Sequence, residues 1–230
     1  MLRSLVAALL LCICIISSAV VAVSEPIDKK ISKCSSEDIE AARKNYNIEQ
    51  NKISRATGHA VRKGLRLELS TGKRVIVLKD DCSEGESYGR YSFERHLTDI
   101  GYYLVSVTAY EGGGFLLIND RNGKQTFISG EPQVSPDKKR VLATSMDFMA
   151  GYSNKTIAMW RLVLTGLEEE YVYDTLNEKA CGASDARWLD NKSVELNLEC
   201  AVSDTSDLTT KTKARLIMKK GKWDLLKLKN

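Results

Sequence analysis

The chain has 230 residues, of which 43% are hydrophobic and 28% are charged, and its formal net charge at pH 7 is only +4. This length suits one domain, or one domain preceded by an arm. The nearly balanced charge argues against a nucleic-acid-binding protein, which concentrates basic residues on one face.

Residues 1–24 have the pattern of a secretory signal peptide. Arg3 precedes an apolar run from Leu5 to Val23, and the small residues Ala22 and Ser24 occupy the −3 and −1 positions of a cut before Glu25. A retained anchor is the alternative, because the run just reaches the length of a membrane-spanning helix. We expect cleavage, which leaves a periplasmic or secreted protein with no stable membrane span.

Four cysteines remain after removal of the leader, and an even number in an exported chain predicts two disulfides. Four cysteines permit three pairings, and we expect the two that join nearest neighbours in sequence. A zinc site is the alternative, but no CxxC spacing occurs, and His59 and His96 are far from any cysteine along the chain. The expected disulfides are Cys34–Cys82 and Cys181–Cys200.

The segment 25–64 is expected to form a helical arm. Its best helical stretch is 35–58, where acidic residues follow Ser36 and a thin apolar stripe includes Tyr46 and Ile53. Gly58 can end the helix. Packing on the main domain is the expected role, and recognition of a partner is the alternative.

From residue 65 to residue 230 the pattern changes to short strands and turns, which predicts a mainly β domain. Asn122-Gly123 is a strong hairpin signal because both residues tolerate positive φ. The expected strands are 65–69, 74–78, 102–110, 115–118, 125–129, 140–145, 156–164, 170–174, 193–199, 213–219 and 223–228.

Two weak internal repeats occur in this domain. The turn at 69–73 recurs at 120–124, and the segment 135–142 recurs at 188–196 with Asp137 matching Asp190. A period near 50 residues with about four strands per period is typical of propeller blades. The length allows three to four antiparallel blades, so we expect a small or incomplete propeller or another antiparallel β fold.

The segment Gln133–Ala143 resembles the "SPDGKR" blade motif of bacterial exported propeller proteins of the TolB type, with Lys138 in place of the glycine. This motif indicates the type of fold and not a catalytic activity. The resemblance implies four-stranded blades that serve as a protein-binding platform.

The residues offer little catalytic chemistry. The chain has two histidines and no GxSxG motif. Carboxylates suited to a glycosidase occur at 80–81, 84–86 and 168–170, but all lie in polar turns or strand ends. The segment 119–123 begins like a calcium loop, but the acid that closes an EF-hand is missing. We therefore expect no enzyme activity, no cofactor and no metal.

The segment Gly85–His96 is the expected contact loop, because tyrosine and arginine dominate binding hot spots. Its candidate partner-binding residues are Tyr88, Arg90, Tyr91 and Arg95. The expected function is an exported protein-binding module, with inhibition of, or immunity to, a secreted or periplasmic enzyme as its specific role. Its expected partner is another exported protein and not a nucleic acid. A carbohydrate- or envelope-binding module is the alternative, and a hydrolase comes third.

Overall fold

The computed structural model describes residues 46–56, 58–83, 85–149, 151–203 and 208–228. The expected signal peptide, Cys34 and the first part of the expected helix lie outside these residues. The described part begins with a helix over residues 46–54, and fifteen strands follow it. No helix in the described ranges is both long and apolar enough to cross a membrane.

The fifteen strands form four antiparallel sheets, each built from consecutive strands. The first sheet has three strands and each of the others has four, which confirms the expected mainly β fold with blade-like antiparallel sheets after a helix. The strands of the first two sheets are β1 (Ala60–Lys63), β2 (Arg66–Ser70), β3 (Val75–Lys79), β4 (Gly89–Leu97), β5 (Tyr102–Ala109), β6 (Gly112–Asn119) and β7 (Gln125–Ile128). Those of the last two are β8 (Gln133–Val134), β9 (Arg140–Thr144), β10 (Lys155–Val163), β11 (Gly166–Asp174), β12 (Cys181–Asp190), β13 (Ser193–Ala201), β14 (Thr209–Lys219) and β15 (Lys222–Lys227).

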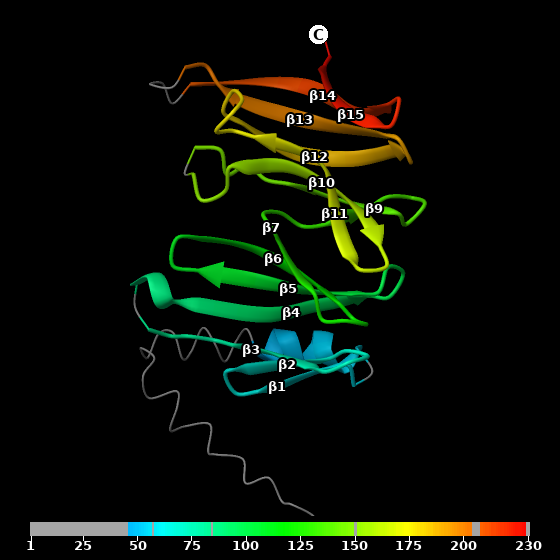
Figure 1. Ribbon diagram of the computed structural model, residues 1–230. Helices are drawn as coiled ribbons and strands as arrows, with labels where there is room; N and C mark the ends of the chain where they lie inside the picture. The colour runs from blue at the N-terminus through cyan, green and yellow to red at the C-terminus, as the bar shows by residue number, and fades with distance from the viewer. Residues whose placement is uncertain (1–45, 57, 84, 150, 204–207, 229–230) are drawn as a thin grey trace, which may run out of the picture.

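The sheets stack face to face in chain order, with the first sheet at the bottom of Figure 1 and the fourth at the top. A buried apolar cluster fills each of the three junctions between neighbouring sheets. Strand β5 shows how packing between two sheets determines which residues a strand carries. Tyr103 and Val105 pack toward the first sheet, whereas Tyr102 and Leu104 pack toward the third. The first half of this strand is a continuous apolar run because both of its faces are buried there.

The sequence repeats correspond to equivalent turns. The turns near Gly72 and Gly123 each join the last two strands of a sheet, and Gly72 N–H donates to the Asp120 carbonyl over 2.8 Å. The turns at Asp137 and Asp190 each join the first two strands, and each aspartate accepts from the amide two residues later. The first sheet therefore corresponds to the last three strands of a blade.

Four strands have no counterpart among those expected from the sequence: β1, β4, β8 and β12. Strand β1 begins at Ala60, inside the segment expected to form the helical arm. All four are the first strands of their sheets in chain order. They carry polar or small residues where the expected strands carry apolar ones, as in Arg90, Ser92 and Glu94 of β4.

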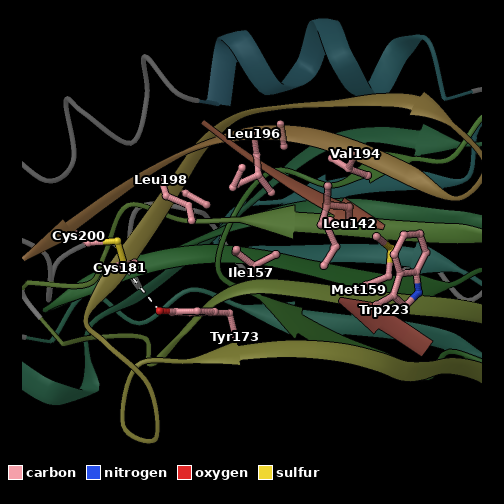
Figure 2. Close-up of a cluster of buried hydrophobic side chains, with 14 residues drawn as sticks. Leu142, Ile157, Met159, Tyr173, Cys181, Val194, Leu196, Leu198, Cys200 and Trp223 are labelled. Atoms are coloured by element: carbon pink, nitrogen blue, oxygen red, sulfur yellow. Dashed lines mark hydrogen bonds between the residues drawn. A yellow bond between two sulfur atoms is a disulfide. The ribbon is translucent and has the colours of Figure 1, made fainter. Parts of the chain in front are cut away.

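The Cys181–Cys200 disulfide forms as expected and lies in the junction between the third and fourth sheets (Figure 2). The two cysteines face each other across β12 and β13. The Tyr173 hydroxyl donates to the Lys179 carbonyl over 2.8 Å and lies 3.3 Å from Cys181 Sγ. Cys82 is also disulfide-bonded, and its expected partner Cys34 lies outside the described residues.

We expect the Cys181→Ala/Cys200→Ala double variant to lose about 3 kcal/mol of unfolding free energy, because the bridge closes a loop of about 20 residues in the unfolded chain. Urea denaturation followed by circular dichroism measures this loss. A loss below about 1 kcal/mol would show that the cross-strand pairing holds the two strands without the covalent bond.

Candidate functional site

The segment expected to be a contact loop is mostly a strand, which corrects that expectation. Tyr88 directly precedes β4, and Arg90, Tyr91 and Arg95 lie within it. Arg90 is opposite Thr108 on β5 and Tyr91 is opposite Val107, so these two side chains leave the sheet on opposite faces. Arg95 forms an exposed ion pair with Glu131 at 2.8 Å.

A cleft of about 270 Å³ lies where the helix over 46–54 meets β4 and β5. It brings together two of the four expected residues, Arg90 and Tyr91, whereas Tyr88 and Arg95 do not line it. No sequence pattern indicated the helical side of this cleft, because the position of β4 against the helix depends on the tertiary fold. Its lining residues are Tyr46, Ile48, Lys52, Arg90, Tyr91, Ser92, Glu94, Ser106 and Thr108.

A buried ionic network forms next to this cleft. The Arg62 guanidinium donates two hydrogen bonds to the Glu49 carboxylate, at 2.8 and 2.9 Å, and lies 3.2 Å from Asp80 Oδ2. The side chains of Glu49 and Asp80 are 1% exposed and that of Arg62 is 3% exposed. The Tyr46 ring lies 5.0 Å from the guanidinium carbon, and its hydroxyl donates to Asp80 over 2.9 Å.

The same network closes the free edge of β4, which is the edge strand of the second sheet. The Tyr91 amide donates to Asp80 Oδ1 over 2.9 Å, and the Phe93 amide donates to Glu49 Oε1 over 2.6 Å. Arg62 Nη2 donates to the Tyr91 carbonyl. These side chains satisfy the polar groups that an edge strand otherwise offers to another strand.

Burial shifts the pKa of two groups of this network, Asp80 and Tyr46. It raises the pKa of Asp80 above its ordinary value, although the Arg62 charge and the Tyr91 amide oppose the shift. Burial also raises the pKa of Tyr46, and the neighbouring Asp80 carboxylate adds to the effect. Proton uptake at Asp80 is therefore easier in the folded protein than in the unfolded chain.

The Arg62→Met variant is expected to lose about 3–5 kcal/mol of unfolding free energy, because it leaves two buried carboxylates without their cation. Chemical denaturation measures this loss. A Glu49→Gln/Arg62→Met/Asp80→Asn triple variant serves as the matched control, since it removes the charges together. The account is contradicted if the triple variant loses as much stability as Arg62→Met alone.

Asp80→Asn is expected to gain stability relative to wild type as the pH rises from about 4 to 7. The raised pKa means that ionisation of Asp80 costs the folded state more free energy than it costs the unfolded state. The contribution of protonated Asp80 to the stability of the wild type is therefore present at low pH and is lost as the pH rises. Unfolding free energies of both proteins, measured across this pH range, show whether the stability difference changes with pH in this direction.

The Asp190→Asn variant is a control for which the expected change of stability with pH has the opposite sign. Hydrogen bonds from the Lys192 amide and the Ser193 hydroxyl lower the pKa of Asp190, so wild type gains stability relative to that variant as the pH rises. Parallel pH profiles for the two variants would contradict the assignment.

The two histidines lie close together, although they are far apart in sequence. The ring centroids of His59 and His96 are 5.4 Å apart, and His96 lies 4.6 Å from the Tyr103 ring. His96 Nε2 is 2.9 Å from Asp120 Oδ2. Within the described residues, no group of three or more potential metal-binding side chains occurs.

The acidic candidates occupy structural contacts. The three contiguous glutamates 168–170 pair with cations on other strands of the same sheet, namely Arg161, Lys155 and Arg140. Burial tends to raise the pKa of Glu170, but hydrogen bonds from Arg140 and Trp223 outweigh it, so the pKa is lowered. In the segment 119–123, Asn119 Oδ1 accepts from two backbone amides, as in a hairpin turn.

The connections between strands divide the ends of the sheets into two edges. One edge, at the left of Figure 1, carries the longer connections, and we call it the loop edge. The opposite edge, at the right, carries short turns, and we call it the turn edge. Among the described residues, the loop edge comprises 64–65, 80–83, 85–88, 110–111, 129–132, 145–149, 151–154, 175–180, 202–203 and 208, and the turn edge comprises 71–74, 98–101, 120–124, 135–139, 164–165, 191–192 and 220–221.

Exposed large apolar side chains gather on the loop edge. Tyr110 is 61% exposed and Leu176 is 78% exposed. The described residues of this edge include seven acids and a single base, Lys179. Sequence reasoning missed this surface because its members are scattered over four separate connections. Its exposed large apolar residues are Tyr110, Met146, Met149, Tyr152, Leu176, Val202 and Leu208.

No protein-family model matches the chain, and no curated protein matches it. Among solved structures it is similar to the N-terminal domain of Nup159, with a TM-score of 0.33 and 8% identity over 74% of this chain and 47% of that chain. It is also similar to a chain of an S. cerevisiae complex of variant Dbp5 and Gle1 with Nup159, IP6 and ADP. There the TM-score is 0.33, with 9% identity over 74% of this chain and 46% of that chain. The chain thus spans about half the length of the solved chains it matches.

Proposed function

We propose that the protein is an exported protein-binding module that contacts its partner through the loop edge. The observation that carries this proposal is the gathering of seven exposed large apolar side chains on one edge of the stack. Contiguous apolar groups on a soluble protein surface mark interaction sites, and tyrosine is enriched at the hot spots of such sites. The intramolecular disulfide is compatible with an oxidising, exported location.

The charge of this edge defines the chemistry of the partner. Glu86, Glu111, Asp147 and Glu178 lie in four different connections of the loop edge, so the apolar groups are surrounded by negative charge. Complementary charge steers association and rejects partners of like charge. We therefore propose a basic exported protein as the partner, with inhibition of a basic secreted enzyme as the specific role.

Contacts between the connections of the loop edge favour a contact surface that is ordered before the partner binds. Tyr152 packs against Gly112, where an added Cβ would lie 3.2 Å from the tyrosine side chain, so the β5–β6 turn and the β9–β10 connection support each other. The Cys181–Cys200 bridge joins the start of β12 to the end of β13 at this same edge. A surface ordered before binding loses less conformational entropy on association.

To test this proposal, the tagged mature protein is used to capture partners from the native exported fraction. The affinity of the protein for the captured partner is then measured. We expect a stoichiometric basic protein whose affinity falls by about tenfold or more in the Tyr110→Ser/Leu176→Ser variant. Both side chains are largely exposed, so the fold tolerates their loss.

Leu164→Ser/Phe127→Ser is the matched control, because Leu164 is 91% exposed and Phe127 is 53% exposed and neither lies on the loop edge. We expect it to bind as wild type does. Equal losses in the two variants, or a captured protein with an acidic surface, would contradict the proposal.

A further inference from the structure

The turn edge has the opposite charge to the loop edge. Its seven turns contain eight lysines and arginines but only three acids, although the whole chain is nearly neutral. The eight cations are all exposed: Lys73, Arg74, Arg121, Lys124, Lys138, Lys139, Lys192 and Lys220. The balanced total therefore conceals a strong separation of charge between the two edges.

Only one of the three acids of the turn edge forms an ion pair with one of these eight cations. Asp99 pairs with Lys138 at 2.8 Å, and Asp120 contacts His96. Asp137 accepts hydrogen bonds from the Ser135 hydroxyl and the Lys139 amide within its own turn. Within the described part of the chain, the other seven cations form no ion pair with a carboxylate.

The cations follow the stack from sheet to sheet. Gly72 N–H bonds the Asp120 carbonyl, which brings the turns of the first and second sheets together. Arg74 Nε lies 3.2 Å from the position of a Cβ at Gly123. Lys124 Nζ lies 3.2 Å from the corresponding position at Gly166 in the third sheet. Packed sheets are roughly 10 Å apart, so the positive charges recur from sheet to sheet along the turn edge.

We propose that the turn edge binds a linear anionic polysaccharide. A row of unpaired cations across stacked sheets is complementary to a chain of repeating negative charges, and the release of counterions from such a chain favours binding. Leu164 is the large apolar residue that this edge exposes, and its described residues include no exposed aromatic ring for stacking on bases. A polysaccharide therefore fits better than a bilayer or a nucleic acid.

The two surfaces lie at opposite ends of the strands, so both can be occupied at once (Figure 1). The polysaccharide would hold the protein at an anionic matrix while the loop edge stays free for a protein. This inference does not depend on the proposed protein partner, because it rests on different residues.

Heparin is the probe, with binding to the mature protein measured by titration calorimetry at several salt concentrations. We expect wild-type affinity to fall steeply with salt, and the Lys73→Gln/Arg74→Gln/Arg121→Gln/Lys124→Gln variant to bind about tenfold more weakly with a shallower salt dependence. The substituted side chains are exposed, so circular dichroism should show an unchanged fold.

The control variant carries the same change in charge away from the turn edge: Arg55→Gln/Lys179→Gln/Lys213→Gln/Lys227→Gln. It should bind heparin within about twofold of wild type. Three results would overturn the proposal: no binding of heparin by wild type, equal losses in the two variants, or tighter binding to phosphatidylglycerol vesicles or single-stranded DNA than to heparin at equal charge concentration.

Discussion

The closure of the β4 edge by Glu49, Arg62 and Asp80 is the constraint on which the rest of the structure depends. A helix, a strand of the first sheet and the connection into the second sheet each supply one of these side chains. Asp80 and Glu49 accept hydrogen bonds from the amides of Tyr91 and Phe93, and Arg62 donates to the Tyr91 carbonyl, so the open edge of the four-stranded sheet is closed. Because all three charges are buried, each needs the others, and the helix and first sheet are fixed against the second.

Because each sheet is built from consecutive antiparallel strands, successive connections alternate between the two edges. Once the first sheet is fixed, each later sheet buries one face against its predecessor, and every long connection falls on one side. The outer face of the fourth sheet carries a charged ladder, in which Glu195 contacts Arg187 and Arg215, and Glu199 contacts Lys211. Such a polar face is typical of the capping unit of a repeat stack. The functional residues can then lie in the connections at the two edges, because the sequences of such connections are free to vary.

The sequence predicted the parts of this fold that depend on local patterns. Apolar runs such as 102–110 and the hairpin signal at Asn122-Gly123 reveal β5 and the β6–β7 turn, and the Asp137 and Asp190 turns reveal the repeat. It missed β4, because alternating Arg90, Ser92 and Glu94 resemble a polar loop when the partners of the strand are unknown. It also could not predict the Glu49–Arg62–Asp80 network or the two edges, since both join residues that are brought together only by the stacking of sheets.

Hydrogen exchange at the backbone amides of Tyr91 and Phe93, measured by NMR, tests the closure of the β4 edge most directly. If the edge is closed, these two amides are protected to a degree comparable to β5 in the wild-type protein. They selectively lose that protection in a Glu49→Ala/Asp80→Ala variant under conditions where it remains folded. Fast exchange of both amides in the wild type, at the rate of exposed edge strands, would contradict the account.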